Sequence, residues 1–168
     1  IDVAVVVRVR TDAREDEELS GMGATVVHRH PSDSFGDAMR SGLAAVPDDA
    51  DLVITMDADG SHDPARIPAL LERATNADVV VASRYVHGGT SDNALVLRVM
   101  SRVLNRAYSF VLGIDCRDVS TNFKLFHRVD LEGLELRCAA FDVVEELLFQ
   151  VASRHGTGLM RPLCHDGV

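Results

Sequence analysis

The chain of 168 residues suits one domain with its own hydrophobic core, expected to cover residues 1–168. Its net charge of −9 disfavours a nucleic-acid binder, and the lack of a signal peptide or membrane-spanning run predicts a cytoplasmic protein. The three cysteines, Cys116, Cys138 and Cys164, have neither a disulfide nor a zinc spacing, which favours a reducing compartment.

Alternating strands and helices are predicted along the first half of the chain. Short apolar runs bounded by turn residues predict buried strands at residues 2–9, 24–28, 52–56 and 78–83. Apolar residues at helical spacing predict helices at residues 14–19, 34–46 and 64–76. Asp33 or Ser34 can cap the second of these helices. Elements that alternate at this pace favour parallel βαβ units, so a mostly parallel sheet flanked by helices is expected.

The second half predicts a glycine-rich loop and a further set of helices and strands. The loop covers residues 84–93, helices follow at 94–112 and 141–155, and strands are expected at 121–126 and 157–164. In the first of these strands, alternation predicts that Lys124 points outward. The helix at 94–112 carries Arg98, Arg102 and Arg106 in one stripe. This stripe is either a solvated helix face or a surface that binds phosphate groups.

Two carboxylates one residue apart, Asp57 and Asp59, follow the apolar run at 52–56. They are expected at the carboxyl end of a strand, where open α/β sheets bind ligands. Alternate residues of an extended chain point the same way, so the pair can converge on Mg²⁺ or Mn²⁺. The alternative is a polar strand end followed by a turn, with Asp63-Pro64 starting a helix.

Several motifs between residues 24 and 164 stand in a recognisable order. They are Phe35-Gly36-Asp37-Ala38-Met39-Arg40-Ser41-Gly42-Leu43, Met56-Asp57-Ala58-Asp59-Gly60-Ser61-His62-Asp63-Pro64, Ala82-Ser83-Arg84-Tyr85, Gly88-Gly89, 98–105, 118–126 and Glu145-Glu146. The combination resembles family 2 glycosyltransferases of the GT-A fold. Within them it resembles the dolichol-phosphate mannose synthase and polyprenyl-phosphate sugar synthase branch. The resemblance implies an α/β, Rossmann-like GT-A domain.

This resemblance also implies a reaction. The expected enzyme is a metal-dependent, inverting glycosyltransferase that moves a sugar from a GDP- or UDP-sugar to a polyprenyl (dolichyl) phosphate. The acceptor is a phosphate monoester that is already anionic at neutral pH, so a strong general base is not obligatory. Such an enzyme would meet its lipid acceptor peripherally at the cytoplasmic membrane face.

The family's functional positions fall on particular residues of this chain. Asp57 and Asp59 are the expected catalytic, metal-binding and diphosphate-binding residues, and Ser61 stands at the third metal position. Arg84 and Arg98 are the expected catalytic contacts to phosphates. Lys124 is the remaining residue that is expected to bind a ligand.

The sequence also departs from this family. The family opens with a strand that ends in a Pro-x-Tyr-Asn-Glu-like turn, and this first βα unit has no counterpart here, so a partial domain is expected. The next strand normally ends in Asp-Asp-Gly-Ser, whereas residues 3–9 run into Arg10-Thr11-Asp12. A C-terminal segment of the branch, Arg-x-x-Gly-x-Ser-Lys-like, is also missing.

Alternatives to catalysis stay open. The chain could be a non-catalytic GT-A-like module that binds a nucleotide or a partner protein. A nucleotidyltransferase would need a glycine-rich basic signature after the first strand, and none is visible. His62 is expected to make a local hydrogen bond in its turn rather than contact a metal. Of Glu145 and Glu146, one could face the acceptor while the other is a solvated helix residue.

Overall fold

In a computed structural model, the described residues are 2–8, 13–27, 34–83, 103, 106, 110, 116 and 118–154. Strand β1 (Val3–Arg8) is followed by helices α1 (Ala13–Gly21) and α2 (Phe35–Ala44). Strand β2 (Leu52–Asp57) then leads through the short 3₁₀ helix η1 (Pro64–Arg66) into helix α3 (Ile67–Ala74) and strand β3 (Val79–Val81). The last described elements are strand β4 (Lys124–His127), helix α5 (Arg128–Leu131) and helix α6 (Val143–Arg154).

A four-stranded sheet in the order β1-β2-β4-β3 forms the centre of the fold. Strands β1 and β2 pair in parallel, with Val3 beside Leu52 and Arg8 beside Asp57. Strand β4 lies between β2 and β3 and is antiparallel to both. The expected mostly parallel sheet is therefore correct only in part, because the late strand β4 takes a central position against the direction of its neighbours. Leu125 and Phe126 of β4 are both fully buried, one on each face of the sheet.

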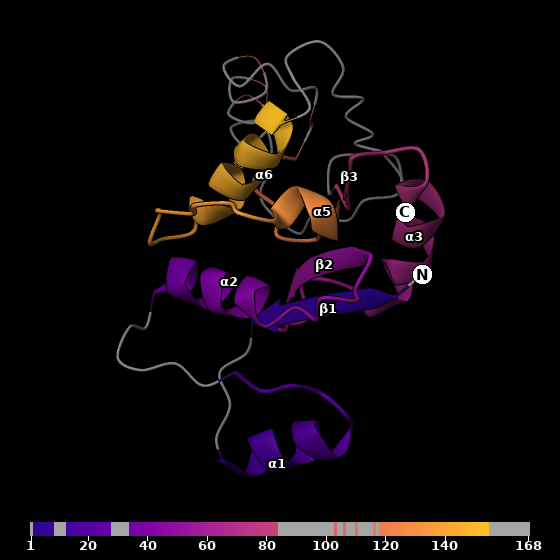
Figure 1. Cartoon of the computed structure of the whole chain (residues 1–168), viewed down its shortest axis with the longest axis vertical. Coiled ribbons are helices and arrows are strands. Elements are labelled where there is room, and N and C mark those ends of the chain that lie inside the picture. The colour runs from indigo at the N-terminus through magenta and orange to yellow at the C-terminus, as the bar shows by residue number, and fades with distance from the viewer. Residues whose placement is uncertain are drawn as a thin grey trace.

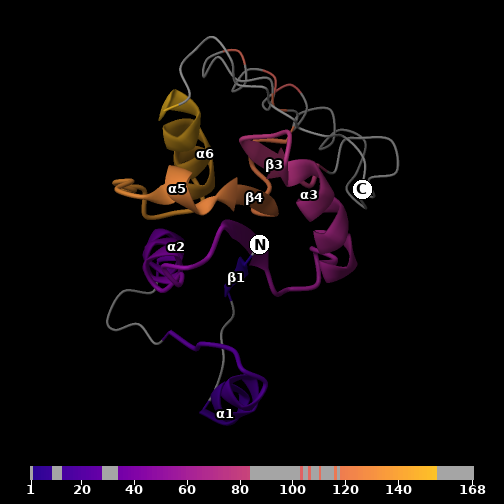
Figure 2. The ribbon, with the colours of Figure 1, turned by 45° about the vertical axis from the view of Figure 1, so that its right-hand side comes forward.

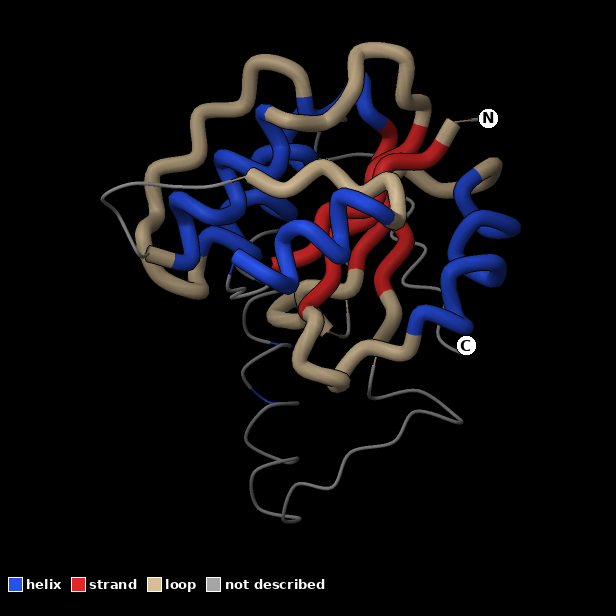
Figure 3. The backbone as a smooth tube through the Cα atoms, turned by 90° about the horizontal axis from the view of Figure 1, so that it is seen from below, coloured by secondary structure: helices blue, strands red, loops and turns tan. Residues whose placement is uncertain are grey.

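Helices cover the two faces of this sheet (Figures 1 and 2). On one face, Leu70 and Ala74 of α3 pack with Ile54, Met56 and other side chains of β2. On the other face, α6 packs against β3 and β4, and Met39 of α2 joins the same cluster. Figure 3 shows the strands at the centre, with helices on both sides. Strand β2 is an interior strand of this sheet, and its carboxyl end is Asp57.

Most of the elements predicted from the sequence are present. Helix α2 begins after Ser34, whose side chain accepts a hydrogen bond from the backbone N–H of Asp37, as the capping prediction requires. The predicted strand at 24–28 is wrong for its described part, since residues 24–27 form no strand and are largely exposed. The predicted strand at 157–164 lies outside the described residues.

The described helices also bear on membrane contact. None of those helices has both the length and the apolar character that crossing a bilayer requires. Of the predicted helix at 94–112, only residues 103, 106 and 110 are described, and all three are helical and exposed.

Candidate active site

The acidic motif forms a tight turn between β2 and η1. Strand β2 is buried along its length except at its last residue, Asp57, whose side chain is 20% exposed. Gly60 has φ +84°, a conformation that glycine adopts without the steric cost of a side chain. Asp63 then caps η1 by accepting a hydrogen bond from the backbone N–H of Ala65 at 3.0 Å. Asp57 thus ends β2, and Asp59 and Ser61 lie in the turn that follows it.

Asp57 is held through both its backbone and its side chain. The Nδ2 atom of Asn122 donates to Asp57 Oδ1 at 3.0 Å. The backbone N–H of Asp57 donates to Nδ1 of His62 at 2.9 Å. The His62 ring in turn stacks on Phe123, with 5.2 Å between the ring centroids. The predicted local hydrogen bond of His62 is confirmed, and the partner is the first acidic residue of the motif.

Asp59 is exposed and lies in the turn rather than in the strand. Its Oδ1 accepts a hydrogen bond from the backbone N–H of Ser61 at 2.9 Å. Hydrogen bonds from the Ser61 side chain and backbone hold the pKa of Asp59 below its ordinary value, because they stabilise the carboxylate. Because β2 ends at Asp57, the turn, and not the alternation of an extended chain, sets the direction of Asp59.

The oxygen atoms of this motif suit a hard divalent cation whose remaining ligands are water and substrate. Within the described ranges, no group of three or more His, Cys, Asp or Glu side chains could hold a metal. The motif therefore offers carboxylate oxygens from two residues, with the Ser61 hydroxyl as a further oxygen. Mg²⁺ is commonly bound by one or two carboxylates, with water and substrate phosphates completing its coordination, and the residues present fit that pattern.

The prediction that Lys124 points outward is wrong. Lys124 is 1% exposed, and its Nζ donates to the carbonyl oxygens of Val119, at 2.9 Å, and Thr121. Helices pack on both faces of the sheet at β4, so alternation does not expose any of the first three side chains of this strand. This position gives no support to a contact between Lys124 and a phosphate.

The two glutamates of α6 have different environments from those expected. Both carboxylate oxygens of Glu146 accept hydrogen bonds from the backbone N–H of Arg137, and one also accepts from Cys138. Burial works against this charge, but the backbone hydrogen bonds outweigh it and lower the pKa of Glu146. Burial raises the pKa of Glu145, and its Oε2 has no hydrogen-bond partner among the described residues. Neither glutamate is therefore an ordinary solvated helix residue.

The structure describes few of the basic residues that were predicted for the site. Arg84, Arg98 and Arg102 lie outside the described residues, so their predicted phosphate contacts stay predictions. Arg106 is exposed on its helix. In contrast, Asn122 was not predicted as a site residue, although it stands within the 118–126 motif. An asparagine before a strand carries no signal of its own, because its partner is 65 residues away in the sequence.

Comparisons with known proteins identify a family and several relatives. Residues 9–134 match glycosyl transferase family 2. The chain is 31% identical over 149 residues to the undecaprenyl-phosphate mannosyltransferase of Micrococcus luteus. This aligned region covers 84% of this chain and 58% of that relative. It is 33% identical over 114 residues to the polyprenol monophosphomannose synthase of Mycolicibacterium smegmatis, which covers 66% of this chain and 43% of that relative.

A third relative is archaeal. The chain is 28% identical over 148 residues to the dolichol-phosphate mannosyltransferase of Pyrococcus furiosus, with 84% of this chain and 41% of that relative covered. The chain thus spans between about two fifths and three fifths of the length of these curated relatives. Since the family match extends over well more than half of its residues, the chain belongs to glycosyl transferase family 2.

Proposed function

We propose that this chain forms part of a glycosyltransferase site that moves a sugar from a nucleotide-sugar to a polyprenyl phosphate. The observation that carries the proposal is the turn at the end of β2, which presents the anchored Asp57 and the exposed Asp59 at the sheet edge. The printed names of the three relatives, which mention undecaprenyl phosphate, polyprenol and dolichol phosphate, support this class of acceptor. Mannose, which those names share, is the donor sugar to test first.

The metal would be Mg²⁺ or Mn²⁺, held by Asp57 and Asp59 with Ser61 as a further oxygen ligand. When bound, it would supply positive charge that stabilises a departing nucleoside diphosphate. The chain contributes a carboxylate fixed by Asn122 and a second one that is ionised at neutral pH, because its pKa lies below the ordinary value. His62 holds the turn in place through the backbone of Asp57.

The reaction would be a single displacement at the anomeric carbon. An oxygen of the acceptor phosphate forms the new bond while the bond to the donor diphosphate breaks, so the configuration at this carbon inverts. Both the nucleophile and the leaving group are anions that need positive partners. Arg84 and Arg98 are proposed for this role, because a guanidinium group binds phosphate oxygens in pairs and stays charged.

The acceptor would bring the protein to a membrane surface. Val103 and Phe110, on the predicted helix at 94–112, are 64% and 89% exposed. These apolar side chains support peripheral contact, which we place at the cytoplasmic membrane face. Flotation with liposomes that contain polyprenyl phosphate should exceed flotation with liposomes that lack it. Equal flotation with the two kinds of liposome would argue against a specific acceptor site.

The metal role is tested by calorimetry with a GDP- or UDP-sugar in the presence and absence of Mn²⁺. Asp57→Asn and Asp59→Asn should each weaken Mn²⁺-dependent binding about tenfold, which corresponds to a lost charged contact of about 1.5 kcal/mol. Asp63→Asn is the matched control, since it removes a carboxylate from the same turn while asparagine caps a helix equally well. Equal affinities in all four proteins would show that the metal role is wrong.

A further inference from the structure

Asn122 lies in the turn before β4 and reaches across to the end of β2. The residue is 3% exposed, and its amide nitrogen donates to Asp57 Oδ1 at 3.0 Å. Its own Oδ1 is buried and has no hydrogen-bond partner among the described residues. Turning the amide over would put this oxygen against the Asp57 carboxylate, so the orientation with the nitrogen toward Asp57 is the favourable one.

Two strands hold the backbone around Asn122. The hydroxyl of Thr55 in β2 donates to the Asn122 carbonyl oxygen at 2.7 Å. The ammonium group of Lys124 in β4 donates to the carbonyl oxygens of Val119 and Thr121 in the same turn. Since all these groups are buried, the turn cannot shift without breaking internal hydrogen bonds. The backbone that carries the Asn122 side chain is therefore held by both strands.

The Oδ1 atom of Asn122, which has no partner among the described residues, is a cost to the fold. A buried acceptor without a partner costs about 1–3 kcal/mol, and an apolar side chain of similar shape would avoid that cost. The side chain of Asp57, by contrast, is 20% exposed, so water reaches part of its carboxylate. The hydrogen bond from the amide to Asp57 offsets part of that cost, and it sets the direction of the Asp57 carboxylate.

We propose that Asn122 is a positioning residue that makes Asp57 a one-oxygen ligand. By binding Oδ1, its amide leaves Oδ2 for the cation, and Oδ2 is 4.0 Å from His62 Nδ1, beyond hydrogen-bond length. Hydrogen-bonded carboxylates of this kind orient metal ligands in many sites. One-oxygen binding suits Mg²⁺ and Mn²⁺, whereas Ca²⁺ often takes both oxygens of a carboxylate. This inference rests on the proposed metal role of Asp57.

The test compares Asn122→Leu with the unchanged protein, because leucine keeps the shape and removes the amide. Mn²⁺ and Ca²⁺ are titrated by calorimetry in the presence of GDP and, separately, of UDP, and thermal unfolding is followed without metal. We expect Mn²⁺ affinity to fall about tenfold, as it does when a group that orients a ligand is lost. Ca²⁺ affinity should fall less, and a cooperative unfolding transition should remain.

Thr121→Val is the matched control, since it removes a hydroxyl that accepts from the Phe123 backbone N–H at 3.3 Å in the same buried turn. It should leave the Mn²⁺ to Ca²⁺ affinity ratio unchanged. If Asn122→Leu does not fold, Asn122→Ala provides the same comparison. A wild-type affinity ratio in the Asn122 variants, while Asp57→Asn weakens Mn²⁺ binding, overturns this inference alone. Unchanged binding in Asp57→Asn overturns the proposed metal role, and the inference with it.

Discussion

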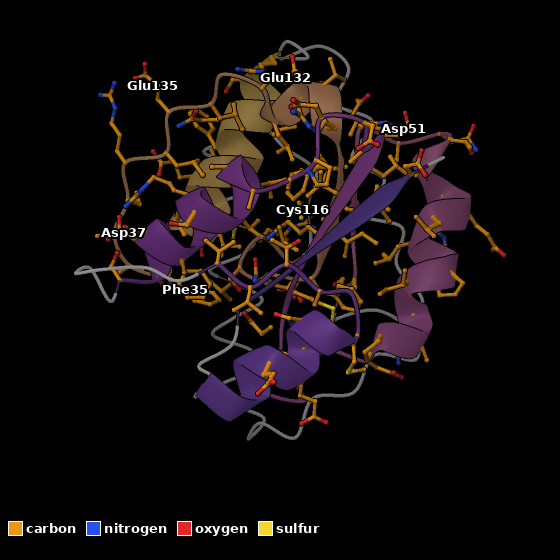
Figure 4. All side chains as sticks on the ribbon, turned by 60° about the horizontal axis from the view of Figure 1, so that its bottom comes forward. Phe35, Asp37, Asp51, Cys116, Glu132 and Glu135 are labelled. Carbon is orange, nitrogen blue, oxygen red and sulfur yellow. The ribbon has the colours of Figure 1, made fainter. Side chains whose placement is uncertain are left out.

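Replacing Gly36 with alanine is expected to destabilise the protein, although alanine is the better helix former. Gly36 is the second residue of α2, where the helix meets the segment at 138–139. Figure 4 shows Phe35 and Asp37, its two neighbours, at this end of α2. An added Cβ would lie 2.0 Å from the carbonyl oxygen of Cys138 and 2.9 Å from Cα of Ala139. Both are backbone atoms, so neither can move aside as a flexible side chain would.

The size of the effect follows from opposing contributions. Alanine in place of glycine within a helix stabilises by about 1 kcal/mol. Separating the two backbones costs about 1–3 kcal/mol as overpacking. It also weakens the hydrogen bond from the Gly36 N–H to the Ala139 carbonyl oxygen, now 2.8 Å, which is worth about 1 kcal/mol. Arg40, which donates to the Cys138 carbonyl oxygen at 2.9 Å, would be disturbed as well. A net loss of about 2 kcal/mol is therefore expected.

Urea unfolding measures this loss as a lower midpoint at an unchanged slope. Gly21→Ala is the matched control, because Gly21 also lies in a helix and an added Cβ would meet nothing within 4 Å. The control should be neutral or stabilising by up to about 1 kcal/mol. If Gly36→Ala were as stable as the control, α2 would not pack on the 138–139 backbone as described.

Three further predictions concern single side chains. Glu146→Gln should cost about 1 kcal/mol at pH 7, since the carboxylate accepts backbone hydrogen bonds. Because the pKa of Glu146 is lowered in the fold, this stability is present above its ordinary pKa of 4.5 and is lost as pH falls through the lower value. Urea midpoints of the two proteins that differ equally at pH 7 and pH 3 would contradict this. Burial, and after it the hydrogen bond with Glu146, raises the pKa of the Cys138 thiol from 9.0 to about 11. Because the thiolate is the reactive form, alkylation of Cys138 by iodoacetamide near pH 8 should be about 100-fold slower than that of a free thiol. Peptide mapping that finds Cys138 modified as fast as free cysteine would refute this. Arg98→Lys should weaken phosphate binding by about 1–3 kcal/mol, measured as donor affinity or as turnover, whereas Arg106→Lys should have no effect. Equal results for the two variants would indicate that the arginine stripe is a solvated helix face.

The local sequence pattern was sufficient to predict the helices and strands that are determined by residues close together in the chain. The apolar run at 52–56 predicted β2, because a buried strand needs a continuous stretch of such residues. The spacing after Ser34 predicted α2, and the hydroxyl of Ser34 caps it as expected. The ordered motifs also pointed to the family that the comparison confirmed. Each of these inferences uses residues that are close in the sequence.

Tertiary structure decided what depends on distant partners. Residues 24–27 have the composition of a strand, yet a strand exists only if another strand pairs with it, and here none does within the described residues. Lys124 points into the protein because helices pack on both faces of the sheet at β4, and this packing is not encoded in the alternation of the strand. The amide of Asn122 meets Asp57 across 65 residues because β2 and β4 are neighbours. The acidic pair was visible in the sequence, but the residue that orients it depends on which strands lie side by side.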